Sequence, residues 1–459
     1  MLDGGIGLNG QYIQNIAHLL NNGFGDMRQD TLEIINSGIS NAIPYRATLD
    51  LIQVNQDEIV AGKHRYPKGS WNKIYVVGVG KGSFPIAQAL EERFGERIEK
   101  GIVVVKAGET RKLEHIEVFQ SSHPIPDERS IIAAQKMMEI LQQAGEDDLV
   151  FAPITGGSSA MVNAPADDID ISELRTVNEL LLKCGAEIGK INTVRKHLCM
   201  LKGGRLVQHA QPAKVITLTL NTAPPDMPWP DMCLPDPTTY QDAFKVLQDY
   251  ELWDKVPLSV QRRLERGLAC PELETLKSLE GMKHTLYSVA DPVSACIAAA
   301  NKARELGYSP HILSTALEGE AKDAGIFLAG ITNEILQHAR PFRSPCALIT
   351  GGETTVTING SCGEGGPNQE TVLGFAAKLY KRGEVVFASV DTDGTDGPCD
   401  IAGGIVDTKT MERAEALNLN LNNALQQHNS SHALRLLGDE IITGHTGTNV
   451  MNLRVVLIK

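Results

Sequence analysis

One glycine-rich turn of the chain is of the kind that holds phosphate: an apolar stretch, IYVVGVGKGS, ends in three glycines and one lysine. Gly78, Gly80 and Gly82 would let the backbone approach an anion, and Lys81 would place a positive charge beside it. A Walker A loop, however, requires Ser or Thr directly after the lysine, where Gly82 stands, and a dinucleotide fingerprint requires a third glycine where Ser83 stands. We therefore predict an anion-binding turn that follows neither template.

A second glycine turn, TGGSSA, offers bare backbone N–H groups and two hydroxyls at the start of a predicted helix. We expect Gly156, Gly157, Ser158 and Ser159 to bind an anion, because the N-terminus of a helix attracts negative charge. An ordinary serine N-cap would explain the same residues equally well. Ser158 does not lie in a G-x-S-x-G motif, so the sequence gives little support for a nucleophilic serine.

Basic residues cluster in INTVRKHLCMLKGGRL, which spans 191–206. Spacings of three and seven place Arg195, Lys202 and Arg205 near one another on a predicted helix. On an acidic chain such a cluster is suited to clamping a phosphate or a carboxylate, although a solvated basic face explains it equally well. His123, in the polar segment SSHPIPDERS, joins Arg195 and Lys202 in the predicted substrate-binding set.

Acidic residues gather in DTDGTDGPCD, directly after a predicted strand. Counted from Asp391, the segment fails the EF-hand pattern, because Asp396 stands where the glycine belongs and the closing glutamate is absent. Carboxylates at a strand end are typical ligands of Mg²⁺, which needs only one or two of them, so the candidate metal ligands are Asp391, Asp393, Asp396 and Asp400. The alternative is a solvated Asx turn. A further turn, GEGGPNQE, places Asn368 and Glu370 at a helix start, and we assign both to the cofactor-binding set.

These clusters all follow apolar runs, so the elements that position them are the ends of strands. Short β-rich runs bounded by glycine alternate with helical periods, a pattern typical of a parallel sheet covered by helices. In such a sheet, ligands bind beyond the carboxyl ends of the strands. We predict two Rossmann-like α/β domains with parallel-rich sheets flanked by helices. The expected ranges are 1–240 for the first domain, 241–283 for a helical connector and 284–459 for the second domain.

The composition is that of an ordinary globular protein, with 459 residues and 42% hydrophobic residues. A net charge of −13 argues against nucleic-acid binding, which needs a basic face. The eight cysteines form no C-x-x-C pair and indicate a reducing cytosol rather than a zinc or thioredoxin site. We see no signal-peptide pattern and no run of 18 apolar residues, so we expect a cytoplasmic protein without membrane contact. The sequence leaves the oligomeric state open, a homodimer included.

The motifs taken together resemble the glycerate 2-kinase family with a MOFRL C-terminal domain, some of whose members carry the label hydroxypyruvate reductase. The likeness runs from about residue 30 to the C-terminus. The motifs occur in the order GVGKGS, SSHPIPDERS, TGGSSA, NTVRKHLCMLKGGRL, LPDPTTY, GGPNQE, DTDGTDGP and TGTNVMNLRV. The resemblance implies two α/β domains with the active site in the cleft between them. It also implies ATP- and Mg²⁺-dependent phosphorylation of D-glycerate on its 2-hydroxyl, giving 2-phosphoglycerate.

Single residues can be carried over from the resemblance. Lys81 matches the active-site lysine of the family, and GGSS matches its glycine-serine loop, while Asp393 and Asp396 match its DGTDG segment. The resemblance thus implies that Lys81 contacts the transferring phosphoryl group. One of the two aspartates would bind magnesium or take the hydroxyl proton, and which one does so stays open. Arg195 and Lys202 would hold the substrate carboxylate or a phosphate.

One segment departs from the family pattern, since relatives usually read SDVxGDD…ASGPT where this chain reads NTAPPDMPWPDMC. We expect this stiffer and more apolar segment, with Trp229 and Met232, to line the ligand pocket and to favour a somewhat larger 2-hydroxy acid over glycerate. Two other functions remain alternatives. An NAD(P)H-dependent hydroxypyruvate reductase would need an acidic residue at the end of the second strand, where Lys106 stands. A non-catalytic nucleotide- or acid-binding relative is the other.

Overall fold

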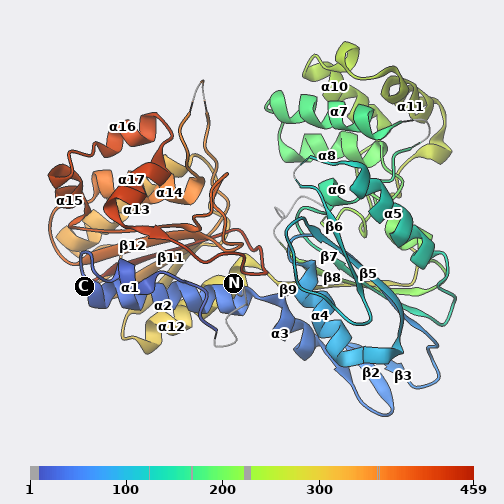
Figure 1. Ribbon diagram of the computed structural model, residues 1–459, viewed down its shortest axis with the longest axis horizontal. Helices are drawn as coiled ribbons and strands as arrows, with labels where there is room; N and C mark the ends of the chain where they lie inside the picture. Colours follow the sequence, from blue (N-terminus) through green and yellow to red (C-terminus); the bar gives the residue numbers. More distant parts are fainter. Residues whose placement is uncertain (1–9, 124, 167–168, 222–228, 359, 361) are drawn as a thin grey trace. The chain divides into compact units, whose positions relative to one another are not determined.

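The computed structural model describes residues 10–123, 125–166, 169–221, 229–358, 360 and 362–459. It groups the chain into two compact units (Figure 1). One unit comprises 44–289, and the other joins the N-terminal residues up to Ile43 to 290–459. Within the described parts of the chain, no helix has both the length and the apolar character that a bilayer crossing requires.

The unit 44–289 is built on a six-stranded sheet with the order β6-β5-β4-β7-β8-β9. The neighbours from β6 to β8 all pair in parallel. Both β4 and β7 are buried along their whole length, as expected of central strands in a parallel sheet covered by helices. The strands are β4 (Ile74–Val79), β5 (Ile98–Lys106), β6 (Glu117–Ser121), β7 (Leu149–Ile154), β8 (Lys214–Leu220) and β9 (His284–Ala290).

Helices and a small second sheet complete this unit. A three-stranded antiparallel sheet consists of β1 (Ile52–Val54), β2 (Glu58–Ala61) and β3 (His64–Pro67). The helices near the main sheet are α3 (Pro44–Leu51), α4 (Ser83–Phe94), α5 (Glu128–Leu141), α6 (Ser158–Met161) and α9 (Arg205–His209). Four further helices share a hydrophobic core of their own: α7 (Ile171–Lys183), α8 (Ile188–His197), α10 (Tyr240–Asp249) and α11 (Leu258–Ala269). Short 3₁₀ turns lie at Gly95–Arg97, Trp253–Lys255 and Pro271–Leu273.

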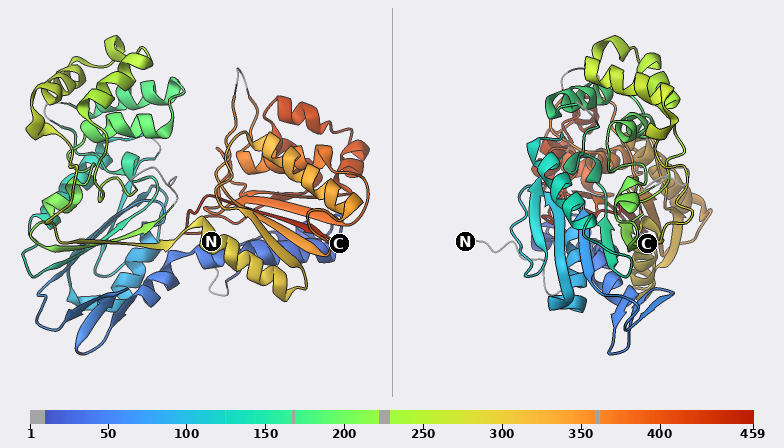
Figure 2. Two further views of the ribbon diagram at one scale, coloured as in Figure 1. Left: turned by 180° about the vertical axis from the view of Figure 1, so that it is seen from behind. Right: turned by 90° about the vertical axis from the view of Figure 1, so that its right-hand side faces the viewer.

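The second unit has a six-stranded sheet with the order β10-β11-β15-β12-β13-β14. Its strands are β10 (Ser309–Ser314), β11 (Cys346–Gly352), β12 (Val385–Asp391), β13 (Gly403–Asp407), β14 (Glu440–Ile441) and β15 (Asn452–Ile458). One face is covered by α1 (Ile16–Leu19), α2 (Gly25–Ala42) and α12 (Pro292–Glu305). The opposite face is covered by α13 (Ala321–His338), α14 (Pro367–Lys378), α15 (Thr410–Ala416), α16 (Leu421–Gln426) and α17 (Ser430–Leu437) (Figure 2).

The predicted α/β class is confirmed, but the second sheet is not parallel-rich. Only β10 and β11 pair in parallel, and the other four neighbouring pairs are antiparallel. The last strand of the chain, β15, lies between β11 and β12 and runs antiparallel to both, while β13 pairs back onto β12. Such pairings join segments that are far apart in the sequence, so the alternation of strands and helices does not reveal them.

The compact units also differ from the expected ranges. The N-terminal helix α2 packs on α12 and on the sheet of the second unit, so residues 10–43 do not belong with the first sheet. The segment 241–283 is not a separate connector, because α10 and α11 bury their apolar faces against α7 and α8. In both cases the partner of an amphipathic helix, which the sequence does not name, decides the unit to which the helix belongs.

Candidate active site

The two predicted glycine turns meet where the strand order of the first sheet reverses. From β4 the sheet continues through β5 and β6 in one direction and through β7, β8 and β9 in the other. The N–H of Lys81 donates to the carbonyl of Gly156 at 2.8 Å, and the N–H of Gly82 donates to the Thr155 hydroxyl at 3.0 Å. In open α/β sheets, ligands bind beyond the carboxyl ends of the strands at such a reversal. The structure therefore places both turns where a ligand is expected.

The backbone of the first turn does not form the predicted anion cradle. The N–H groups of residues 80–83 all donate to acceptors within the protein, at 2.8 to 3.3 Å. Gly80 has a φ of 134°, and a Cβ there would lie 2.1 Å from the Thr155 hydroxyl oxygen. A Cβ on Gly78 would lie 3.1 Å from Pro153. The glycines therefore serve the close packing of the two turns.

The second turn keeps polar groups for a ligand. Gly157 has a φ of 89°, which favours glycine, and the ring of His123 lies so close that a Cβ on Gly157 would be 3.1 Å from it. The hydroxyl of Ser158 is buried and has no hydrogen-bond partner among the described residues. The hydroxyl of Ser159 donates to Asp231 Oδ2 at 3.2 Å. Asp231 was not among the predicted site residues, and its only signal in the sequence is a carboxylate within the altered segment.

The predicted basic cluster divides into residues with different roles. The guanidinium of Arg205 donates to main-chain carbonyls at 3.0 to 3.4 Å, three of them between Lys196 and Lys202 and one at Leu273, so Arg205 is structural. Lys202 is buried, and its ammonium donates to the carbonyl of Ser159 at 2.8 Å and to Asn163 Oδ1 at 3.1 Å. Burial lowers the pKa of Lys202. Lys202 thus ties α6 to the chain after α8 and adds a cation behind the second turn.

Arg195 is held differently, because its Nε donates to the neutral side chain of Asn178 at 2.5 Å. Burial lowers the pKa of Arg195, and the carboxylate of Asp231 acts in the opposite direction. The charge of Arg195 also contributes to lowering the pKa of Lys202. The charges of Arg195, Lys202 and Asp231 therefore lie near one another, although no direct ion pair joins any two of these described residues. The two terminal amino groups of Arg195 make no hydrogen bond to a described residue.

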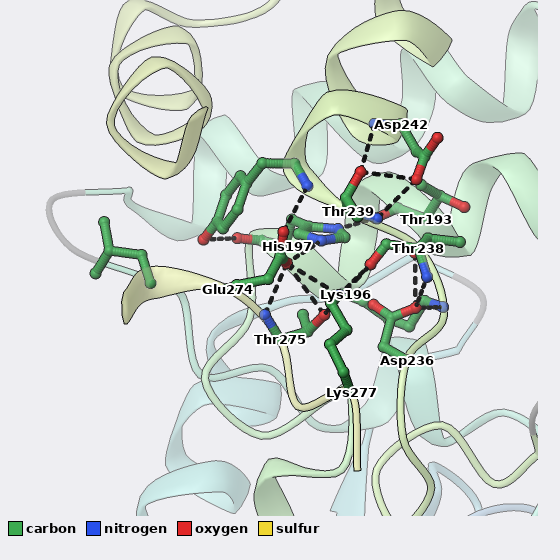
Figure 3. A network of polar contacts seen from close by, with 12 residues as sticks. Thr193, Lys196, His197, Asp236, Thr238, Thr239, Asp242, Glu274, Thr275 and Lys277 are labelled. Atoms are coloured by element: carbon green, nitrogen blue, oxygen red, sulfur yellow. Dashed lines mark hydrogen bonds and ion pairs between the residues drawn. The ribbon is translucent and has the colours of Figure 1, made fainter. Parts of the chain in front are cut away.

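A network of polar contacts fixes the end of α8 beside Arg195 (Figure 3). Lys196 donates to Asp236 Oδ1 at 2.5 Å. His197 is fully buried, with Nδ1 at 2.7 Å from the carbonyl of Thr193 and Nε2 at 2.9 Å from Glu274 Oε1. Hydrogen bonds from His197 and from two backbone N–H groups hold the pKa of Glu274 far below its usual range, against the effect of burial. The motif LPDPTTY, which contains Asp236, therefore anchors the helix that carries Arg195.

The altered segment does not line a pocket with Met232. Residues 222–228 of this segment lie outside the described residues. Met232 and Cys233 are fully buried in the core of the first sheet, and the backbone carbonyls of Asp231 and Met232 accept N–H groups of 204 and 206 at 3.0 and 3.2 Å. The indole of Trp229 donates to the carbonyl of Leu220 at 3.1 Å. The expected apolar wall is therefore wrong for Met232, because this side chain packs in the core.

Further predicted site residues lie in the other unit, at the start of α14. Both carboxylate oxygens of Asp396 are occupied: one accepts the N–H and side-chain amide of Asn368, each at 3.0 Å, and the other accepts those of Gln369 at 3.0 and 3.1 Å. Glu370 pairs with His428 at 2.9 Å, and burial raises its pKa. Contacts within this unit thus occupy the polar groups of Asp396, Asn368 and Glu370, and these contacts anchor the start of α14.

Acidic residues gather at the end of β12. Asp393 Oδ1 accepts the N–H and hydroxyl of Thr395 at 2.9 and 2.8 Å, and Oδ2 accepts the amide of Asn449 at 3.2 Å. Removal from water, together with the nearby charges of Asp393 and Glu353, raises the pKa of Asp391 well above its usual range. Carboxylate oxygens are ligands that Mg²⁺ prefers, so this donor set would suit that ion. Within the described residues, no three His, Cys, Asp or Glu side chains enclose a metal ion, but Mg²⁺ keeps most of its waters.

Known proteins resemble this chain along most of its length. Residues 30–265 match a domain of unknown function, DUF4147, and residues 346–452 match the MOFRL family. The chain is 40% identical to a glycerate 2-kinase from Pyrococcus horikoshii, over 94% of this chain and 98% of that protein. It is 35% identical to a D-glycerate 2-kinase from Thermotoga maritima, over 94% and 98%.

Solved structures extend the likeness to the fold. A crystal structure of a glycerate kinase from Thermotoga maritima has a TM-score of 0.82 at 34% identity, over 95% of this chain and 100% of that chain. A second crystal structure, of a Pyrococcus horikoshii protein, has a TM-score of 0.80 at 39% identity, over 94% and 98%. Such matches define a two-domain kinase class. The chain belongs to the glycerate 2-kinase family.

Proposed function

We propose that this protein is an ATP-dependent kinase that phosphorylates the 2-hydroxyl of D-glycerate and forms 2-phosphoglycerate. The family membership supports the reaction class. One structural observation carries the substrate class: a buried arginine whose hydrogen-bond partner is a neutral amide, so that its charge is uncompensated by a direct ion pair. Buried charges are costly unless paired, and a small carboxylate would pair with this one.

On the substrate side, Arg195 would hold the carboxylate of the acid, and Lys202 would add positive potential behind it. Arg195 and Lys202 carry two positive charges, and Asp231 carries one negative charge, so this group suits a monoanion. A guanidinium matches a carboxylate with two parallel hydrogen bonds, which an ammonium does not. His123, which lies against Gly157, would border the same substrate.

On the phosphate side, ATP would supply the phosphoryl group and Mg²⁺ would compensate charge on its oxygens. Lys81 would contact the transferring group, and the unpartnered Ser158 hydroxyl would donate to a phosphate oxygen. Asp391 and Asp393 would hold Mg²⁺. Phosphoryl transfer depends on positioning and charge compensation more than on covalent help from the protein.

The hydroxyl proton must leave as the 2-hydroxyl oxygen bonds to phosphorus and the bond to the ADP oxygen breaks. Asp393 is the better proposal for the acceptor, because it is partly exposed, whereas Asp396 is buried and its carboxylate holds the start of α14. Asp396 would instead keep α14 in place.

A coupled assay of ADP release with D-glycerate, L-glycerate, erythronate, threonate and glycerol tests the proposal. We expect turnover with D-glycerate, ³¹P spectra of the 2-phosphate and no turnover with uncharged glycerol. Turnover of erythronate and threonate tests whether segment 221–235 widens the substrate specificity beyond glycerate. If no acid stimulates ADP release while calorimetry detects nucleotide binding, the non-catalytic alternative holds instead.

The reductase alternative finds no support at the ribose position. Strand β5 ends at Lys106, and the nearby Glu109 is engaged by Arg111, whose Nε donates to it at 2.8 Å. NADH oxidation with hydroxypyruvate in the absence of ATP would nonetheless contradict the kinase assignment.

A further inference from the structure

Two buried arginines of this protein are compensated in opposite ways. Arg28 lies between two carboxylates, with its Nε 2.7 Å from Asp407 Oδ2 and its Nη1 2.9 Å from Asp439 Oδ1. Arg195 has one hydrogen-bond partner among the described residues, the uncharged oxygen of Asn178. A buried guanidinium without a direct carboxylate partner is costly. Arg205 offsets that cost with bonds from both amino groups to main-chain carbonyls, whereas Arg195 keeps both amino groups for a ligand that would complete the pairing.

Asn178 is itself rigidly held. It lies on α7 and is 4% exposed, and its Nδ2 donates to the carbonyl of Leu174 at 2.8 Å while its Oδ1 accepts from Arg195. The carbonyl can only accept and the guanidinium can only donate, so this orientation of the amide is the only one that satisfies both groups. The bond to Nε fixes the plane of the guanidinium and leaves its two terminal amino groups for another partner.

We propose that Asn178 is a positioning residue that determines specificity for a carboxylate: it aims the guanidinium of Arg195 while leaving its charge for the substrate. This inference rests on the proposed function. Asn178 contacts α8 from α7, so it acts through Arg195 rather than on the acid. A neutral acceptor is essential to the role, because an aspartate at this position would orient the guanidinium equally well but would compete with the carboxylate of the acid for its charge.

The decisive variants are Asn178→Leu and Asn178→Asp. The leucine is nearly isosteric and removes the acceptor, so we expect the KM for D-glycerate to rise at least tenfold while the KM for ATP changes less than twofold. The aspartate keeps the acceptor but adds a negative charge, and we expect an equal or larger rise in the KM for the acid. In both variants the preference for D-glycerate over its neutral amide, glyceramide, should fall at least tenfold.

Asn333 offers a matched control. It is also a buried asparagine on a helix, and its amide also joins two groups, since Nδ2 donates to the carbonyl of Lys378 at 3.0 Å and Oδ1 accepts the N–H of Tyr380 at 2.9 Å. Neither partner is charged. Asn333→Leu should lower the melting temperature about as much as Asn178→Leu, but it should leave the KM for the acid and the selectivity unchanged.

Arg195→Ala separates this inference from the proposed function. If Arg195→Ala leaves the KM for D-glycerate unchanged, the carboxylate clamp itself is wrong. If Arg195→Ala raises that KM but Asn178→Leu lowers only the melting temperature, like Asn333→Leu, the clamp stands and Asn178 is merely structural. Binding of D-glycerate followed by calorimetry, without ATP, gives the same comparison independently of turnover.

Discussion

Replacement of Arg28 by methionine is expected to destabilise the protein strongly. Arg28 is fully buried on α2 and bonds Asp407 at 2.7 Å, Asp439 at 2.9 Å and the carbonyl of Leu19 at 3.2 Å. In this variant Asp439 would still form an ion pair with Arg413, whose Nη2 lies 2.6 Å from Asp439 Oδ2. The same Nη2 is 3.9 Å from Asp407 Oδ2, too far for a hydrogen bond. The substitution therefore leaves Asp407 as a buried carboxylate without a close cation.

The magnitude follows from the cost of breaking a buried ion pair, about 3–5 kcal/mol. For a unit of this size each kcal/mol shifts the melting temperature by roughly 2–4 °C, so the expected decrease is on the order of 10 °C. Urea denaturation of the full chain, followed by circular dichroism, measures the change in the free energy of unfolding. Lys73→Met is the control, because Lys73 forms an exposed pair with Glu99 and should matter little.

A double-mutant cycle makes the reasoning sharper. Asp407→Asn in the Arg28→Met background removes the uncompensated charge and should recover part of the lost stability, whereas Asp407→Asn alone should destabilise. A loss below about 1 kcal/mol for Arg28→Met would refute the argument that Asp407 depends on Arg28.

Three further predictions concern the site and the pH dependence. Lys81→Ala should lower kcat by roughly 10²-fold, the order expected for the loss of one preorganised charge, with an unchanged melting temperature; a near-normal kcat would remove Lys81 from the mechanism. Asp393→Asn should raise the Mg²⁺ concentration needed for half-maximal activity, whereas Asp396→Asn should mainly lower the melting temperature, since four hydrogen bonds to α14 depend on its charge; equal Mg²⁺ titrations for both variants and the wild type would contradict this assignment. Burial lowers the pKa of His284 to about 4, so this neutral histidine contributes stability that is complete above about pH 6.5 and is lost as the pH falls towards 4, by up to about 3 kcal/mol. His284→Gln should weaken the pH dependence of the free energy of unfolding, measured by urea denaturation, between about pH 6.5 and 4. An unchanged pH dependence would show that another group causes it.

Much of the fold was predictable from the sequence. The apolar runs of β4, β7 and β8 and the glycines after them indicate buried parallel strands whose ends carry polar turns, and the structure has them. The pattern could not indicate that β15 inserts between β11 and β12, or that α2 packs on α12, because both contacts join distant segments.

The sequence by itself determined the residue types that could do chemistry: a lysine among glycines, paired serines, a basic cluster and an acidic strand end. Only the tertiary structure decided which of them remain available for it. Arg195 and Arg205 look alike at a spacing of ten residues, yet one meets a neutral amide and the other meets main-chain carbonyls. The N–H groups of the first glycine turn and the carboxylate of Asp396 have partners within the protein, and Met232 packs in the core. The physical reason is that a polar group's hydrogen-bond partners, and an apolar group's neighbours, come from parts of the chain that local spacing does not reach.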